Sequence, residues 1–144
     1  MGELFAVVSG KGGTGKTSLC AALATALAKE GKRVLCIDCD VGLRNLDISL
    51  GLSECGALSF WDVSEGGYSL EDAFRHPVYP TLAFLTAPMN CPVEKIDDAA
   101  FREMLGRARQ LYDYVFLDAP AGVDAGFRLA AQFADRFLLV TGAG

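Results

Sequence analysis

The sequence is poor in the residue that builds the commonest proton relays and zinc sites. Histidine occurs only as His76, so clusters of several histidines are excluded. His76 stands before Pro77 near a predicted helix end, and nothing close to it in the sequence would complete a relay. We therefore interpret His76 as a structural residue of a turn.

The cysteines lack the spacing of a disulfide framework, and their number, five, is odd. Cys36 and Cys39 form a C-x-x-C pair, but no second pair or histidine pair follows that would complete a zinc site. We interpret Cys36 as a strand residue and Cys39 as part of the loop after it. This cysteine pattern predicts a reduced, cytoplasmic protein.

Positive charge and long apolar runs are also scarce. The 13 basic residues against 18 acidic ones give a net charge of −5, which argues against a dedicated nucleic-acid surface. No apolar run approaches the roughly 18 residues of a membrane span, and the N-terminus lacks the basic region of a signal peptide. Apolar residues still make up 51% of the 144, so we expect one folded domain over residues 1–144.

Short apolar runs alternate with helical patterns along the chain. This alternation predicts an α/β fold, with a mostly parallel sheet covered by helices on both faces. Gly31 is expected to end the first helix, and Asp97 or Asp98 to begin a later one. The predicted strands are 4–9, 33–38, 82–86, 114–118 and 136–141, and the predicted helices are 17–30, 59–64, 69–76, 97–111 and 126–134.

A glycine-rich loop joins the first predicted strand to the first predicted helix. The stretch "GKGGTGKT" fits G-x-x-x-x-G-K-[ST], in which glycines let backbone N–H groups face phosphate oxygens. The helix N-terminus adds about half a positive charge. We predict that Lys16 binds the β- and γ-phosphates of a nucleotide and that Thr17 binds Mg²⁺. The predicted nucleotide-binding residues are Gly10, Lys11, Gly12, Gly13, Thr14, Gly15, Lys16, Thr17 and Ser18.

Three aspartates lie at the ends of predicted strands. Asp118 ends "YVFLD", where a carboxylate can join a Mg²⁺ shell. Asp38 and Asp40 close the second strand, where a carboxylate can orient and polarise an attacking water. Ligands bind at the carboxyl ends of strands in such sheets. The structural alternatives are a cap or turn residue for Asp118 and a solvated acidic loop for Asp38 and Asp40.

Three segments carry a resemblance to a known family. "KGGTGKT", "CIDCDVGLRNLDISLGL" and "FLDAPAG" resemble the deviant Walker A motif, the first switch region and the Walker B segment of the MinD/ParA ATPases, and most of all those of the MinD branch. The resemblance covers nearly the whole chain and implies a P-loop, Rossmann-like ATPase domain that binds ATP or ADP with Mg²⁺. It also implies that residues 1–144 are the N-terminal portion of a longer domain, because the family's adenine-contacting segment and membrane-targeting helix lie further along.

The resemblance implies a role for each charged residue. Lys11 would reach across a dimer interface to the nucleotide of the other subunit, as an arginine finger does. Asp40 would orient the water, and Asp38 and Asp118 would belong to the outer shell of the metal. The expected catalytic residues are therefore Lys11, Lys16 and Asp40, in a dimer that ATP favours and ADP dissolves. Without the resemblance, a solvated loop charge explains Lys11 equally well.

The function implied is a MinD-like ATP-driven switch that helps to place the division septum. Its implied partners are regulators of the MinC and MinE type and a second copy of the chain, without nucleic acid. Full-length family members are peripheral to the inner face of the cell membrane, through a C-terminal helix that these 144 residues lack.

Three other functions remain open at this point. A ParA-type DNA or plasmid-partition ATPase shares the loop but needs a basic surface, against which the net charge argues. An iron–sulfur reductase of the same superfamily needs cluster cysteines, and none lies between Asp118 and Gly144. A non-catalytic nucleotide-binding fragment would also fit a chain that ends directly after a predicted strand.

Overall fold

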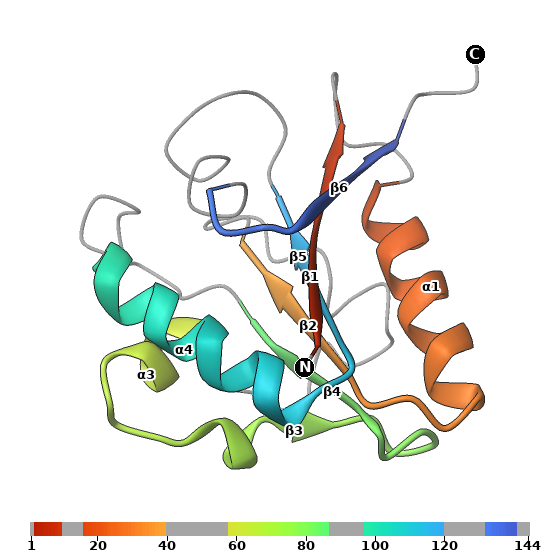
Figure 1. The fold of residues 1–144 in the computed structure, drawn as a ribbon. Helices are drawn as coiled ribbons and strands as arrows, with labels where there is room; N and C mark the ends of the chain where they lie inside the picture. The colour runs from red at the N-terminus through yellow and green to blue at the C-terminus, as the bar shows by residue number, and fades with distance from the viewer. Residues whose placement is uncertain (1, 10–15, 40–57, 87–96, 120–131, 141–144) are drawn as a thin grey trace.

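A six-stranded sheet forms the centre of the computed structural model, which describes residues 2–9, 16–39, 58–86, 97–119 and 132–140 (Figure 1). The strand order is β3-β4-β2-β5-β1-β6. Four of the neighbouring pairs are parallel and only β3 pairs antiparallel, with β4, which confirms the predicted mostly parallel sheet. The strands are β1 (Glu3–Ser9), β2 (Val34–Asp38), β3 (Phe74–Arg75), β4 (Leu82–Leu85), β5 (Tyr114–Asp118) and β6 (Arg136–Val140).

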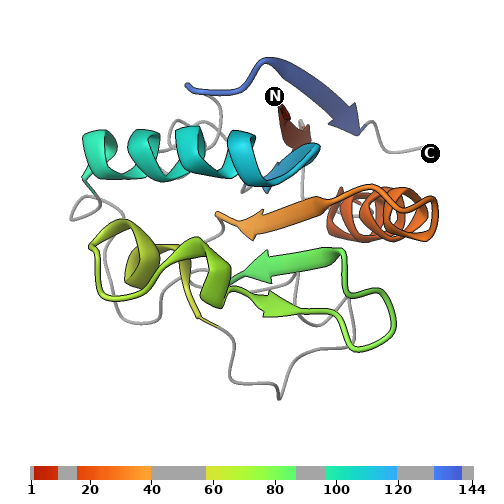
Figure 2. The same cartoon turned by 60° about the horizontal axis from the view of Figure 1, so that its bottom comes forward.

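Helices cover both faces of this sheet, as predicted. Helix α1 (Lys16–Lys29) lies on one face, and α3 (Phe60–Ser64) and α4 (Asp98–Leu111) lie on the other (Figures 1 and 2). The described helices include none that is long and apolar enough to cross a bilayer. The result is a three-layer α/β domain in which the sheet separates two hydrophobic cores.

Alternation along the strands distributes side chains between the two cores. In β2, Leu35 and Ile37 pack on the α4 side, whereas Cys36 packs on the α1 side. Small residues face the sheet from α1, which lets that helix lie close, while Phe101 and other large residues face it from α4. The α1 residues in that core are Cys20, Ala21, Ala24 and Ala28.

The helix ends follow the predicted capping chemistry. Asp97 caps α4, with its side chain accepting a hydrogen bond from the Ala99 N–H at 2.9 Å. Gly31 follows α1 with a φ of +85°, a conformation that glycine adopts without strain. Its N–H bonds to the Ala28 carbonyl at 3.0 Å. Both boundaries were therefore set by local sequence.

The predicted helix over residues 69–76 is wrong. The chain forms only a short 3₁₀ turn, η1 (Leu70–Asp72), and then pairs β3 with β4. The Asp72 carboxylate accepts the Ser69 N–H at 3.2 Å and holds that turn. Phe74 then packs edge-on against Phe84, with ring centroids 5.7 Å apart. This long-range contact outweighs the weak local preference for helix.

The structure describes only part of the last two predicted elements, a helix and a strand. The predicted helix 126–134 lies mainly outside the described residues, and its described part, 132–134, is a turn and not a helix. The predicted strand 136–141 is confirmed as β6 up to Val140, with residue 141 outside the described part.

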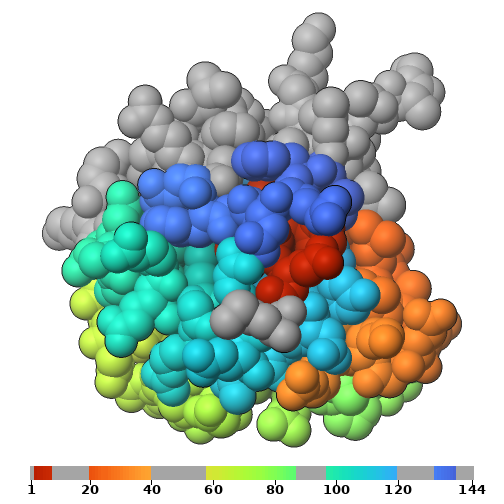
Figure 3. All heavy atoms as spheres, in the orientation of Figure 1, coloured from red at the N-terminus to blue at the C-terminus, as the bar shows by residue number. Residues whose placement is uncertain are grey.

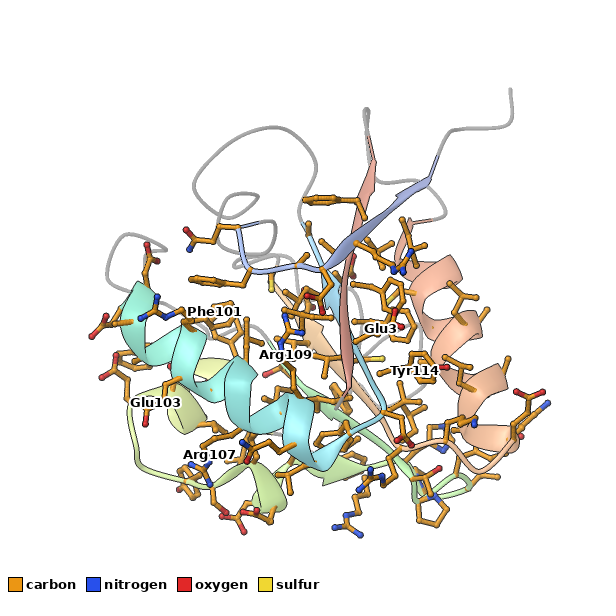
Figure 4. All side chains as sticks on the ribbon, in the orientation of Figure 1. Glu3, Phe101, Glu103, Arg107, Arg109 and Tyr114 are labelled. Carbon is orange, nitrogen blue, oxygen red and sulfur yellow. The ribbon has the colours of Figure 1, made fainter. Side chains whose placement is uncertain are left out.

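Asp135 ties the beginning of β6 to β1 and α4. Its backbone N–H donates to the Leu4 carbonyl at 2.8 Å, and its carboxylate accepts the Leu4 N–H at 2.9 Å. Arg109 donates to the same carboxylate and, at 3.2 Å, to the Phe133 carbonyl (Figure 4). Hydrogen bonds from Arg109, and then from Leu4, lower the pKa of Asp135.

Replacing Asp135 by Ala should lower the free energy of unfolding by about 1–2 kcal/mol at pH 7, because the buried Leu4 N–H loses its carboxylate and Arg109 its partner. The folded-state pKa lies below the unfolded one, so this stability is present above about pH 4 and is lost as the pH falls further. Urea unfolding at pH 7 and pH 3 measures both effects. A matched Glu30→Ala variant should change stability by less than about 0.5 kcal/mol, and an unchanged Asp135→Ala deficit at pH 3 would contradict the linkage.

Candidate functional site

The carboxyl ends of β1, β2 and β5 meet at one edge of the sheet. These three strands are parallel and adjacent, so their last residues lie side by side. The predicted phosphate loop follows β1, and α1 begins at the same edge (Figure 1). This is the edge at which open α/β sheets bind ligands.

Asp38 and Asp118 are neighbours at this edge. They are register partners at the ends of β2 and β5, and they are only 1% and 0% exposed. Register partners in adjacent parallel strands lie about 4.8 Å apart and point to the same face. Their strand neighbours Cys36 and Phe116, two residues earlier, pack on the α1 side. Alternation therefore places both carboxylates on the face that carries α1.

Backbone hydrogen bonds to the neighbouring strands hold the chain in place directly after each of the two aspartates. The Cys39 N–H donates to the Asp118 carbonyl at 3.0 Å, and the Ala119 N–H donates to the Val7 carbonyl at 3.1 Å. Val7 is also the register partner of Asp118. Sequence patterns did not single out Val7, because only the strand register shows that it sets the position of this carboxylate.

The structure brings together part of the predicted site. Lys16, Thr17 and Ser18 form the first turn of α1, so the helix N-terminus shares an edge and a face with Asp38 and Asp118. Gly10, Lys11, Gly12, Gly13, Thr14, Gly15 and Asp40 lie outside the described residues. The roles of Lys11 and Asp40 therefore remain predictions.

The described residues of this site suit a magnesium nucleotide. A helix N-terminus favours phosphate, and Mg²⁺ is held in proteins by one or two carboxylates together with phosphate oxygens and water. Across the described ranges, no three His, Cys, Asp or Glu side chains cluster, which is the pattern that an all-protein metal cage would need. Asp38 and Asp118 would thus hold a cation jointly with phosphate and water.

The structural interpretations of Cys36, Cys39 and His76 are confirmed. Cys36 packs in the core on the α1 side and Cys39 in the core on the α4 side, so the pair does not converge on one metal. His76 Nδ1 accepts the N–H groups of Val78 and Tyr79 at 3.0 and 3.3 Å. The histidine therefore closes the turn before β4.

Comparison with known proteins places the chain among nucleotide-binding domains. The CobQ/CobB/MinD/ParA nucleotide binding domain matches residues 5–137. The septum site-determining protein MinD of Thermotoga maritima is 40% identical over 142 residues, which cover 98% of this chain and 52% of the relative. The chain thus spans about half the length of the curated relatives that it matches.

Solved structures that resemble this chain also include MinD proteins. A chain of the MinC:MinD cell division protein complex of Aquifex aeolicus has a TM-score of 0.82 and 38% identity, covering 95% of this chain and 55% of that one. MinD of Pyrococcus horikoshii, solved with Mg-ADP, has a TM-score of 0.82 and 32% identity, covering 98% of this chain and 58% of that one.

A double-mutant cycle tests whether Asp38 and Asp118 interact. Like charges repel, so the double Asn variant should be less stable than the sum of the two single changes predicts, by about 0.5 kcal/mol or more. Urea unfolding of the four proteins in buffer without divalent cations measures this difference. Pairing Asp38→Asn with the distant Asp97→Asn should give additive changes, and additivity for both pairs would show that the two strand-end carboxylates are not coupled.

Proposed function

Because the chain belongs to the CobQ/CobB/MinD/ParA family of nucleotide-binding domains, we propose that it is the nucleotide-binding part of a MinD-like ATPase. In this proposal ATP binding and hydrolysis switch a dimer that helps to place the division septum. The observation that carries it is the convergence of Asp38, Asp118 and the start of α1 at the edge where the G-x-x-x-x-G-K-[ST] loop follows β1.

In this proposal, positively charged groups bind the phosphates and the aspartates bind the cation and the water. The N-terminal turn of α1 and Lys16 would bind the phosphates, and backbone N–H groups of the glycine-rich loop would donate to them. Bound Mg²⁺ supplies positive charge that offsets the charge of the phosphate oxygens. Thr17 would bind this ion, and Asp38 and Asp118 would hold the waters around it. Asp40 orients the attacking water.

Lys11 makes the site depend on a second subunit. A lysine supplied in trans adds positive charge where negative charge develops on the phosphates, so a monomer should hydrolyse ATP slowly. Dimer closure then completes the site and reports the bound nucleotide. ATP favours the dimer and ADP the monomer.

The regulators and the cellular location that we propose rest on similarity to the relatives. The Aquifex aeolicus structure contains MinC together with MinD, which supports a MinC-type regulator for this chain. On the basis of the family resemblance, we also propose a MinE-type regulator and a cytoplasmic location. The full-length protein would contact the inner face of the cell membrane. The net charge of −5 favours this function over DNA partition.

Nucleotide capture is tested by titrating the 144-residue chain with Mg·ATP in a calorimeter. We expect saturable binding that Lys16→Ala weakens by about 10- to 100-fold, because a charged hydrogen bond to phosphate contributes roughly 1.5–3 kcal/mol. Lys29→Ala, at the opposite end of α1, is the matched control and should bind as the unchanged chain does. Equal affinity of the Lys16→Ala and unchanged chains would refute the assigned phosphate site.

The trans role of Lys11 is tested with two inactive variants of the full-length protein. Lys11→Ala and Asp40→Ala should each lower stimulated hydrolysis by about 10³-fold or more, the effect typical of a charge supplied in trans. Mixing them in equal amounts should restore about a quarter of the activity, because about half of the randomly formed dimers are mixed. One of the two sites in each mixed dimer combines an intact Asp40 with the partner's intact Lys11. Phosphate release measures this recovery. A mixture that stays inactive while forming dimers would place Lys11 in its own subunit's site.

A further inference from the structure

Residues 76–81 form the turn between β3 and β4, and this turn rests against the C-terminal end of α1. We call it the histidine turn, because His76 begins it. The His76 N–H donates to the Leu82 carbonyl at 2.8 Å and so continues the pairing of β3 with β4. In Figure 3, green residues of this part of the chain lie beneath the orange end of α1 at the lower right.

The His76 ring closes the turn by accepting two hydrogen bonds at one atom. The N–H groups of Val78 and Tyr79 donate to Nδ1 at 3.0 and 3.3 Å. An imidazole nitrogen accepts a hydrogen bond only while it carries no proton, so the neutral ring has its proton on Nε2. Protonation of the ring puts an N–H on both nitrogens, and the charged ring can then accept neither bond in any orientation. The closed turn therefore requires a neutral histidine.

The groups around His76 do not compensate a positive charge on its ring. The ring lies against that of Tyr79, with centroids 5.3 Å apart, and the tyrosine hydroxyl is neutral below about pH 10. The Lys29 ammonium of α1 lies 5.8 Å from the centroid of the same tyrosine ring, and Arg75 of β3 precedes His76 in the chain. Within the described ranges, no carboxylate forms an ion pair with His76. A charge on this ring would thus add to two nearby positive charges.

The histidine turn also supports the end of α1 and the beginning of β2. The Thr81 hydroxyl donates to the Ala28 carbonyl at 3.5 Å, and the Thr81 carbonyl accepts the Val34 N–H at 2.9 Å. Tyr79 is half-buried and packs against the hydrophobic core on the α1 side. Opening of the turn would therefore loosen the contact with α1 as well as the pairing of β3 with β4.

The composition of the chain makes the charge of His76 easy to isolate. Histidine is the side chain that ordinarily changes charge between pH 5 and 8, and His76 is the only histidine among the 144 residues. Carboxyl groups ordinarily titrate near pH 4, below this range. A substitution at this single position therefore separates the effect of the imidazole charge from that of the other titratable groups.

We propose that His76 is an acid-sensitive latch, which closes the histidine turn against α1 while its ring is neutral and opens the turn when the ring is protonated. The closed turn excludes a proton from Nδ1, whereas the unfolded chain takes one up freely. The stability that the latch contributes is therefore present above the pH at which histidine ordinarily titrates and is lost as the pH falls through it. The latch lies at the opposite end of the sheet from Asp38 and Asp118, so this inference stands apart from the proposed ATPase activity.

Nuclear magnetic resonance of the 144-residue chain between pH 7.5 and 5.5 tests whether the turn opens. We expect the Val78 and Tyr79 amides to lose protection from hydrogen exchange in step with titration of the His76 ring, and the cross-relaxation between the Tyr79 ring and the Lys29 side chain to weaken. His76→Asn is the matched variant, because an asparagine side-chain oxygen accepts the N–H two residues on and does not titrate. Its turn should stay closed over the whole range.

Urea unfolding of the same proteins gives a second readout. From pH 7.5 to 5.5 the unfolding equilibrium constant of the unchanged chain should rise about three- to tenfold more than that of His76→Asn, because mainly the unfolded chain binds the extra proton. His76→Phe keeps a ring but accepts no hydrogen bond, so it should be less stable than His76→Asn by a similar factor at both pH values. Equal pH dependence of the unchanged chain and His76→Asn, or Val78 and Tyr79 amides that stay protected at pH 5.5, would overturn the proposal.

Discussion

The register of β5 between β1 and β2 is the constraint on which the site depends. It pairs Asp118 with Asp38 on one side and with Val7 on the other. A slip of β5 by one residue that moved Asp118 into the place of Leu117 would turn the carboxylate toward the α4 core, beside Ala6 and Ile37. The strand register that buries the apolar side chains of β5 is therefore also the register that places Asp118 beside Asp38.

Packing in the two hydrophobic cores determines where α1 lies relative to these strands. Phe84 and Phe116 project from the sheet onto the small residues of α1, while the large residues of α4 fill the other face. Because α1 packs on the sheet from Cys20 to Ala28, its first turn lies beside the strand ends. The helix N-terminus and the two aspartates thus form one preorganised edge, which suits a site that binds both phosphate and a cation.

The places where sequence patterns failed share a physical cause. Residues 69–76 have a helical pattern and a good cap at Ser69, but Phe74 gains more by packing on Phe84 in the sheet than by extending a short helix. The network around Asp135 joins residues 4, 109 and 135, and no local pattern links positions so far apart. The packing of α3 on α4 likewise joins distant residues, with Phe60 against Phe101.

The sequence alone determined the features that depend on neighbouring residues. Periodicity located β1, β2, β4, β5, β6, α1, α3 and α4, cap chemistry set Asp97 and Gly31, and the spacing of glycines and lysine marked the phosphate loop. Tertiary structure alone decided the strand order, the pairing of Asp38 with Asp118, the face that both share with α1, and the contact of α3 with α4. These features join residues distant in the chain, and their free energy comes from packing and pairing that form only when the whole sheet assembles.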